Sequence, residues 1–178
     1  MATLYTLGHG ARSGQGFVGL LRDAAISKLV DVRAFPASRR NPQFSRARLA
    51  TMLAPHHIGY DWRGEALGGF RKGGEHSVHT ALKHPMFRAY AEHMESCTFV
   101  RAGEALAVAA ESERTCIMCA ESDPAHCHRS LIADWLVARG HRVIHLLEEQ
   151  RQREHLLNPF AVVEEGRLVY RGAQRKLL

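Results

Sequence analysis

The sequence predicts an α/β fold in a single domain, with a mostly parallel open sheet and helices on both faces. Short apolar segments of strand length alternate along the chain with segments whose apolar residues recur at helical spacing, and this order is typical of a parallel sheet with crossover helices. The chain has 178 residues, of which 46% are hydrophobic. Because this size suits one compact core, residues 1–178 are expected to form one domain.

Four apolar segments are expected to form the main strands of the sheet, and a weaker segment is expected to join them. Each is an apolar run of strand length, and helical patterns separate one run from the next. The four segments are 4–7, 28–32, 115–118 and 143–147, and the weaker segment is 58–62.

Helical spacing of apolar residues predicts the helices. The first helix has an apolar stripe at intervals i, i+3, i+4 and i+7, formed by Phe17, Leu20, Leu21 and Ala24. Another helix has a stripe formed by Leu131, Ile132, Trp135 and Leu136. We expect this helix to end near Gly140, because glycine is common just beyond helix C-termini. Two more helices are expected over 86–94 and 103–110.

Two segments outside this alternation have signatures of their own. Residues 64–74 are rich in glycine and basic residues, and we expect them to form a mobile loop or lid. Near the C-terminus, the segments 161–163 and 167–170 flank Glu164-Glu165-Gly166. This pattern predicts a C-terminal hairpin added to the edge of the sheet.

Polar residues follow three of the predicted strands where each strand ends. They are Gly8-His9-Gly10, Asp31-Val32-Arg33 and Cys119-Ala120-Glu121. Ligands of open α/β sheets bind at the carboxyl ends of the strands. We therefore expect the three groups to converge on one edge of the sheet and to form one pocket there.

Segment 117–130 is dense in reactive side chains, with two thiols, two imidazoles, two carboxylates and a guanidinium. Asp123 is suited to cap a helix and Pro124 to occupy its first position, so the N–H groups of the next turn would form an anion site. Cysteines near such an end, beside Arg129 and two histidines, tend towards a lowered pKa. Thiolates act as nucleophiles and as metal ligands, and the sequence leaves both uses open.

The charge distribution indicates a polyanionic partner. The formal net charge is +6, and basic residues crowd into the first half of the chain. They include Arg33, Arg39, Arg40, Arg46, Arg48, Arg63, Arg71 and Lys72. The loop 33–45 also holds two phenylalanines, whose rings either stack on bases or fill the core beneath the loop. Nucleic acid or another phosphorylated polyanion is the expected partner, and a solvated basic face is the alternative.

Composition excludes several classes of protein. The chain has four cysteines, but it is too large and too apolar to be a small secreted domain that disulfides hold together. No N-terminal signal segment is seen either. No apolar stretch approaches the roughly 18 residues that a membrane span needs. We expect a cytoplasmic protein with reduced thiols and no membrane partner.

Five motifs are spread over almost the whole chain. They are Thr6-Leu7-Gly8-His9, Val30-Asp31-Val32-Arg33, Arg39-Arg40-Asn41-Pro42-Gln43-Phe44, Leu67-Gly68-Gly69, and Cys119-Ala120-Glu121-Ser122-Asp123-Pro124 with Cys127-His128-Arg129-Ser130. In this combination the chain resembles the DUF488 family. The resemblance implies a small, compact α/β protein and implies no particular activity. The motif positions that it carries over as site candidates are His9, Asp31, Arg33, Arg39, Arg40, Asn41, Cys119, Glu121, Cys127, His128 and Arg129.

Two uses of segment 119–130 depend on its cysteines. Covalent thiol chemistry of the rhodanese or phosphatase kind needs a short cysteine-to-arginine loop, whereas Cys119 lies ten positions before Arg129 and Cys127 only two. A zinc or iron site could draw its ligands from Cys119, His126, Cys127 and His128. The order of residues superficially resembles a zinc deaminase, but too little chain separates Glu121 from the following proline.

We favour a third use, acid–base chemistry without a required cofactor, on a phosphate-bearing substrate such as a nucleic acid or a nucleotide. Carboxylates beside arginines at strand ends suit cleavage of a glycosidic or related bond. The candidate catalytic residues are Glu121, Asp31, His9, His128 and Cys127. The candidate substrate- and phosphate-binding residues are Arg33, Arg39, Arg40, Asn41, Arg71, Lys72 and Arg129. The fourth use is a nucleic-acid-binding module without turnover, in which these groups pack or form structural ion pairs.

Overall fold

The computed structural model describes residues 1–148 and 151–172, and it confirms the predicted α/β class. Its main sheet has six strands in the order β3-β2-β4-β1-β5-β6. The strands are β1 (Thr3–Gly8), β2 (Lys28–Asp31), β3 (Gly59–Trp62), β4 (Thr115–Cys119), β5 (Arg142–Glu148) and β6 (Arg151–Glu154). The first five are parallel, and β6 pairs antiparallel with β5.

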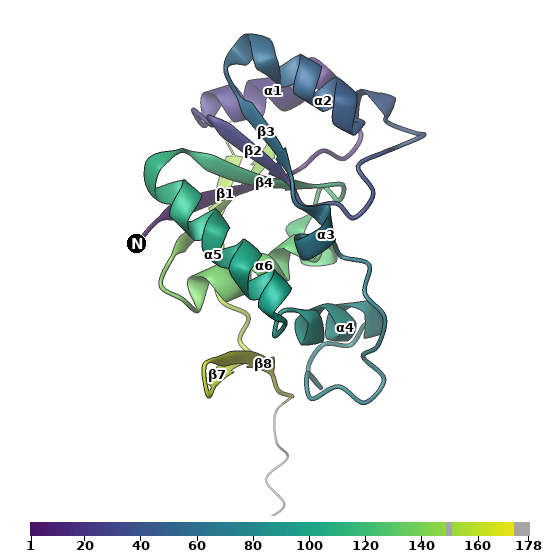
Figure 1. Cartoon of the computed structure of the whole chain (residues 1–178), viewed down its shortest axis with the longest axis vertical. Coiled ribbons are helices and arrows are strands. Elements are labelled where there is room, and N and C mark those ends of the chain that lie inside the picture. The colour runs from purple at the N-terminus through teal and green to yellow at the C-terminus, as the bar shows by residue number, and fades with distance from the viewer. Residues whose placement is uncertain (149–150, 173–178) are drawn as a thin grey trace, which may run out of the picture.

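Helices cover both faces of this sheet, as predicted. Figure 1 shows α1 (Gly14–Asp23) and α2 (Arg46–Leu53) on one side, with α5 (Cys97–Ser112) and α6 (Arg129–Val137) on the other. The shorter elements are α3 (Gly64–Leu67), α4 (Pro85–His93) and the 3-10 turns η1 (Pro42–Phe44), η2 (Ala54–His56) and η3 (Pro124–His126). In the described part of the chain, no helix combines the length and the apolar character that a membrane crossing requires.

Alternate strand residues build two cores, one on each face of the sheet. Leu7 and Met118 pack in one buried cluster with Phe17 of α1. Ile117, the neighbour of Met118 on β4, packs in the other cluster with Trp135 of α6. Because successive strand residues point to opposite faces, the apolar runs of the sequence supply both cores at once.

The C-terminal hairpin forms, but the prediction that it joins the edge of the main sheet is wrong. β7 (Ala161–Glu164) and β8 (Arg167–Tyr170) make a separate two-stranded sheet, because β6 already pairs with β5 at that edge. The hairpin is anchored elsewhere, since the hydroxyl of Tyr170 donates a hydrogen bond to Asp134 of α6 at 2.9 Å.

The glycine-rich segment 64–74 is not a free lid along its whole length. It begins with α3, in which Leu67 is buried. Gly69 then lies against an imidazole, because a Cβ atom added there would come within 2.6 Å of His128 Nδ1. In this part of the segment, glycine permits close packing against the carboxyl edge of the sheet.

Candidate functional site

A pocket of about 540 Å³ opens at the carboxyl edge of the sheet, where the sequence predicted that the strand ends converge. The N–H of His9 donates to the carbonyl of Cys119 at 2.9 Å, and the N–H of Val32 donates to the carbonyl of Met118 at 3.0 Å. These bonds join the ends of β1, β2 and β4. His9, Arg33 and Cys119 all line the pocket, whose volume is in the usual range of ligand sites.

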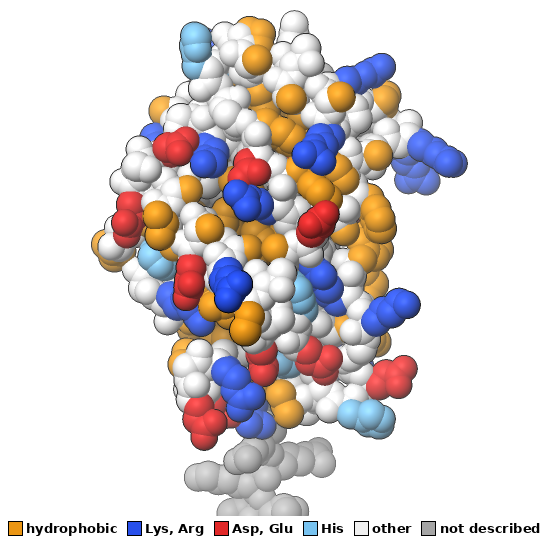
Figure 2. Space-filling model, in the orientation of Figure 1, with side chains coloured by type: hydrophobic (Ala, Val, Ile, Leu, Met, Phe, Trp, Pro, Cys, Tyr) orange, Lys and Arg blue, Asp and Glu red, His pale blue; other side chains and the backbone are white. Residues whose placement is uncertain are grey.

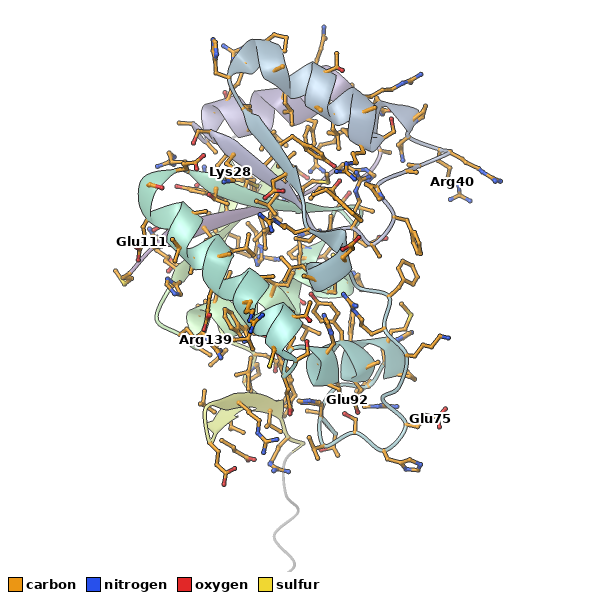
Figure 3. The ribbon with its side chains drawn as sticks, viewed as in Figure 1. Lys28, Arg40, Glu75, Glu92, Glu111 and Arg139 are labelled. Atoms are coloured by element: carbon orange, nitrogen blue, oxygen red, sulfur yellow. The ribbon has the colours of Figure 1, made fainter. Side chains whose placement is uncertain are left out.

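The rim of the pocket combines exposed aromatic rings with exposed arginines. Phe35 and Phe70 are 70% and 67% exposed, and their ring centroids lie 5.6 Å apart. Arg39 and Arg40 come from the loop between β2 and α2 and line the same pocket. Figure 2 shows hydrophobic surface bordered by Lys and Arg side chains, and Figure 3 shows Arg40 extending into solvent. We call Phe35, Phe70, Arg39 and Arg40 the aromatic–basic rim.

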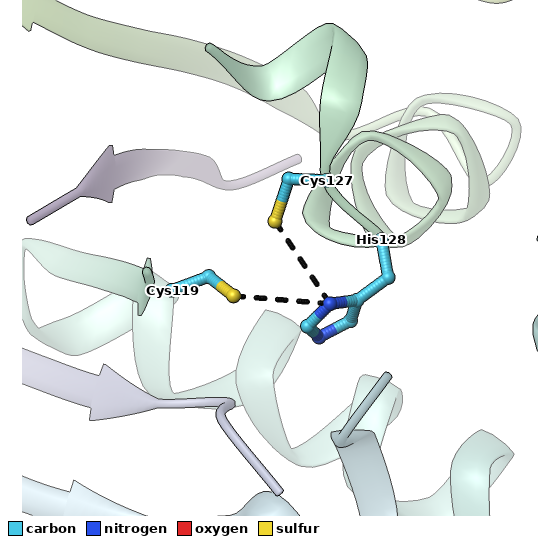
Figure 4. A group of neighbouring side chains, drawn as sticks. All are labelled: Cys119, Cys127 and His128. Atoms are coloured by element: carbon cyan, nitrogen blue, oxygen red, sulfur yellow. Dashed lines mark hydrogen bonds between the residues drawn. The ribbon is translucent and has the colours of Figure 1, made fainter. Parts of the chain in front are cut away.

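Deeper in the pocket, Cys119, Cys127 and His128 form what we call the thiol–imidazole cluster (Figure 4). His128 Nδ1 lies 3.8 Å from the Sγ atom of Cys119 and 3.8 Å from that of Cys127. The other ring nitrogen, Nε2, lies 3.2 Å from the carbonyl oxygen of Val32. Since a carbonyl can only accept a hydrogen bond, Nε2 carries the proton of the neutral ring and Nδ1 presents its lone pair to the sulfurs.

The surroundings separate the pKa values of the two thiols. A hydrogen bond from Cys119, together with the charge of Arg129, lowers the pKa of Cys127 well below its ordinary value. The same hydrogen bond and burial raise the pKa of Cys119. The pair therefore favours a thiolate at Cys127 beside a protonated Cys119.

Two neighbours fix the imidazole of the cluster. The ring of Tyr90 meets the ring of His128 edge-on, with 4.9 Å between centroids, and the Tyr90 hydroxyl donates to the carbonyl of Leu67 at 2.7 Å. Gly69 leaves no room for a side chain, because an added Cβ would lie 2.6 Å from Nδ1 and 2.9 Å from Cγ of the ring. The position of His128 therefore depends on the absence of a side chain at residue 69.

Replacing Gly69 by Ala is expected to displace the His128 ring from the two sulfurs while the sheet stays folded. The methyl group would occupy space that ring atoms now fill at 2.6–2.9 Å. The measurement is the pair of His128 ring nitrogen resonances by NMR, with thermal melting to verify folding. Gly19→Ala is the matched control, because a Cβ at Gly19 of α1 meets nothing within 4 Å. Unchanged His128 resonances in Gly69→Ala would contradict the close packing.

Asp31 and Arg33 form a buried ion pair. Asp31 accepts hydrogen bonds from Arg33 Nε at 2.9 Å, from Arg33 Nη2 at 2.6 Å and from the hydroxyl of Tyr60 at 2.7 Å. Arg33 also donates to the carbonyl of Phe44 at 2.8 Å. Asp31 has no exposed surface. This geometry favours a structural ion pair over the role of catalytic base at Asp31.

His9 lies beside this pair and is held neutral. Its Nδ1–H donates to the carbonyl of Gly10 at 2.8 Å, which leaves Nε2 to accept from Arg33 Nη1 at 3.3 Å. Burial, followed by the charges of Arg33 and Arg12, lowers the pKa of His9. Its ring stacks on buried Phe44 with 4.5 Å between centroids. Of the two loop phenylalanines, Phe44 thus fills the core, whereas Phe35 faces solvent.

Arg129 holds the loop after β4 instead of facing the pocket. Its guanidinium donates to the carbonyls of Glu121 and Ser122, the latter at 2.7 Å, and the side chain is only 1% exposed. Gly8 packs against this loop so closely that a Cβ there would collide with the Glu121 carbonyl. The Glu121 residue itself is exposed and lines the pocket.

The remaining predicted binding residues divide between the pocket and its surroundings. Asn41 lines the pocket. Arg71 stabilises its own loop, donating to the carbonyls of Gly68 at 3.0 Å and Glu65 at 2.7 Å. Lys72 is exposed and lies outside the set of pocket-lining residues. Neither of these two cations lines the pocket.

The predicted anion site at a helix start after Asp123 does not form as expected. Asp123 accepts from the N–H of Ala125 at 3.0 Å, but it caps only the short turn η3, and α6 begins separately at Arg129. His126, a predicted metal ligand, lines the pocket but is paired with Asp123 at 3.3 Å and lies outside the thiol–imidazole cluster. The cluster thus contains three of the four predicted ligands.

Sequence reasoning missed the wall of the pocket that α4 contributes. Met86 and Phe87 line the pocket, and Tyr90 supports the His128 ring. The helical pattern over 86–94 was visible, but no motif indicated that this helix lies against the carboxyl edge. The available signal was the Leu67-Gly68-Gly69 motif, because paired glycines indicate that the backbone packs closely against another part of the protein.

Comparison with known proteins gives a match to one family. A family model described as "Domain of unknown function DUF488" matches residues 13–136 of the 178. This range includes Cys119, Cys127 and His128. No curated protein and no solved structure matches the chain.

Proposed function

Since the chain belongs to the DUF488 family, a domain of unknown function, we propose from its pocket that the protein is a hydrolytic enzyme acting on a nucleotide or a nucleic-acid strand. One observation carries the proposal: the thiol–imidazole cluster lies in the same pocket as the aromatic–basic rim. The cluster offers reactive groups, and the rim offers a surface for a base and its phosphates.

The rim fits the two chemical parts of a nucleotide. Exposed Phe35 and Phe70 present ring faces and edges 5.6 Å apart between centroids, and stacking on such rings stabilises a bound base by about 1–3 kcal/mol. Arg39 and Arg40 beside them provide charge-assisted hydrogen bonds to phosphate oxygens. Contiguous exposed apolar surface next to charge is typical of a binding site.

The pocket also contains a group suited to proton transfer. In a hydrolytic step, the oxygen of a water molecule bonds to the electrophilic atom, the bond to the leaving group breaks, and the leaving group takes up the proton that the water loses. Glu121 lines the pocket and is exposed, so its carboxylate is suited to move this proton. This retains the expected acid–base role for Glu121 and reassigns Asp31 to structure. A glycosidic or related bond remains the proposed target.

The contacts of Arg129 count against a covalent thiol mechanism of the phosphatase or sulfurtransferase kind. Such a mechanism needs an arginine directed at the oxyanion beside the cysteine. Arg129 instead donates to the carbonyls of Glu121 and Ser122 and does not line the pocket. A substrate phosphate is therefore assigned to the rim arginines.

The double substitution Arg39→Ala with Arg40→Ala is expected to weaken binding of a fluorescent single-stranded oligonucleotide and to flatten its salt dependence. Each phosphate contact on a single strand contributes about 0.7 to the slope of log K against log salt, so two lost contacts reduce it by about 1.4. Fluorescence anisotropy at several salt concentrations measures this slope.

Two comparisons make the binding test specific. Arg48→Ala with Arg101→Ala removes two exposed arginines that do not line the pocket, and it should leave the slope unchanged. Phe35→Ala with Phe70→Ala should weaken binding without changing the slope, because stacking involves no counterion release. If the rim arginine variant kept the full slope, nucleic acid would be removed from the proposal.

A further inference from the structure

We propose that Cys119, Cys127 and His128 bind a zinc ion whose fourth coordination position opens into the pocket. Zinc is commonly bound by thiolate sulfur and imidazole nitrogen, and sites with three protein ligands leave one position for water or substrate. The binding site stands on the geometry of the cluster alone, while its role as the centre of hydrolysis rests on the proposed function.

The two sulfur-to-nitrogen distances within the cluster are close to those of a tetrahedral site. With Zn–S bonds of about 2.3 Å and a Zn–N bond of about 2.0–2.1 Å, the S···N edges of a tetrahedron are about 3.6 Å. Both S···N distances here are 3.8 Å, and the three ligand atoms all lie within 4.8 Å of one another. Small side-chain adjustments would therefore bring all three atoms onto one ion.

The second ring nitrogen of His128 has the partner that a metal-binding histidine usually has. Nε2 lies 3.2 Å from the carbonyl oxygen of Val32, at the end of β2. Such a hydrogen bond fixes the tautomer and aims the lone pair of Nδ1 at the metal position. Tyr90 and Gly69 restrict the ring further, as described above, so this ligand is preorganised.

The ligands come from two regular elements of the fold. Cys119 is the last residue of β4, and His128 directly precedes α6. Cys119 and Cys127 are 7% and 2% exposed, and His128 is 9% exposed. A site that is anchored on a strand end and a helix start keeps its ligand spacing without a metal.

The open position would face the substrate. All three ligands line the pocket, together with Glu121. A water molecule on a three-ligand zinc ion loses its proton near pH 7, and the Glu121 carboxylate in the same pocket is suited to accept that proton. The resulting hydroxide would supply the oxygen that the hydrolytic step requires, and the leaving group would take up the transferred proton.

The test is the zinc content of the full-length protein after incubation with zinc and removal of excess metal by gel filtration. We expect about one zinc per chain, as a three-ligand site predicts. Cys119→Ser, Cys127→Ser and His128→Asn should each lower the retained zinc several-fold, while Cys97→Ser, which removes the exposed thiol, should retain it. Circular dichroism verifies that each variant is folded.

Substitution with Co²⁺ tests the ligands in the wild-type chain and needs no variant. We expect thiolate-to-cobalt charge-transfer bands and a d–d spectrum of tetrahedral intensity, since both depend on bound cysteine sulfur. Absence of these bands, or zinc retention that is independent of the three ligands, would overturn the proposal. The oligonucleotide salt slope is measured on the same samples with and without zinc. If the metal-site proposal is wrong, the zinc measurement fails but the salt slope is unchanged. If the nucleic-acid proposal is wrong, the salt slope fails but the protein still retains zinc.

Discussion

Replacing Asp31 by Asn is expected to lower the free energy of unfolding by about 3–5 kcal/mol, because it leaves the Arg33 guanidinium buried without its counter-charge. Asp31 has no exposed surface, and the Arg33 side chain in the ion pair is only 6% exposed. The amide could replace some of the hydrogen bonds that the carboxylate accepts, including the one from Tyr60 at 2.7 Å, but not the charge. Urea denaturation followed by circular dichroism measures the change.

Asp61→Asn is the matched control, on the neighbouring strand β3. Its partner Arg63 is 2.8 Å away, but the two side chains are 33% and 53% exposed, so solvent screens the pair. Surface pairs of this kind contribute about 0–1 kcal/mol. If Asp31→Asn were as stable as Asp61→Asn, the Asp31 carboxylate would not be needed by the fold, and the role of catalytic base would be favoured for it again.

The four main strands that the sequence predicted are those whose residues are mostly buried, whereas the weaker segment 58–62 became β3, which has no buried residue. β1, β2, β4 and β5 are runs of apolar residues that the two cores require. β6 was not predicted, because all four of its residues, Arg151–Glu154, are exposed and polar. β6 forms because its backbone pairs with the edge of β5. The residues of β6 alone do not indicate this pairing. The displacement of the hairpin from the sheet edge has the same origin.

Helix α2 was missed for a related reason. Arg46–Leu53 buries only Leu49 and Leu53, so its apolar stripe is too short to stand out among arginines and alanines. A helix of two turns with one buried pair is stabilised by the core that it covers more than by its own pattern. The longer helices α1 and α5 have several buried positions each, and their periodicity was visible.

The place of the site was predictable because it follows from topology. Parallel strands end at one edge, so polar residues after β1, β2 and β4 had to meet there. The roles of the charged residues were not predictable, because each depends on groups that arrive from elsewhere. Tyr60 of β3 approaches Asp31, and carbonyls of the 121–122 loop approach Arg129. A charged residue that serves the fold and one that serves a substrate look alike until these partners are known.

The arginines at and around the pocket fall into two sets with different environments. Arg33 and Arg129 are 5% and 1% exposed and bond to protein acceptors, whereas Arg39 and Arg40 are exposed at the rim. The buried set fixes the strand ends and the loop that carries Glu121. The exposed set is available to a polyanion. Substitutions in the buried set should therefore lower the free energy of unfolding. Substitutions in the exposed set should instead change the salt dependence of nucleic-acid binding.

Lowering the pH from 8 to 5 is expected to destabilise the protein, with about 2 kcal/mol of the loss due to His145 alone. Burial, followed by the charges of His155, Arg129 and Arg153, lowers the pKa of His145 from 6.5 to about 3. Between these values the unfolded chain binds a proton that the folded chain does not bind. The contribution of His145 is therefore full above about pH 6.5 and is lost as the pH falls towards 3.

The hydrogen bonds of His145 explain why the folded protein keeps this ring neutral. Its Nδ1 lies 2.7 Å from the Thr6 hydroxyl of β1, and its Nε2 lies 2.9 Å from His155 Nδ1. His155 Nε2 in turn lies 2.8 Å from Asp134 Oδ1 of α6. A positive charge on His145 would thus have to form beside another imidazole in a largely buried network, and the charge of Asp123 offsets only part of the effect of burial.

Comparison of His145→Gln with the wild type isolates this contribution. His9, His79 and His93 also have pKa values lowered chiefly by burial, so the wild-type pH dependence contains their shares as well. Urea denaturation at pH 8 and pH 5 should show a stability loss that is smaller in His145→Gln by about 2 kcal/mol. His56→Gln, at an exposed position, should behave as the wild type does. Equal losses in His145→Gln and the wild type would show that His145 does not contribute, and would assign the pH dependence to other groups with shifted pKa values, such as the other three histidines and Cys127.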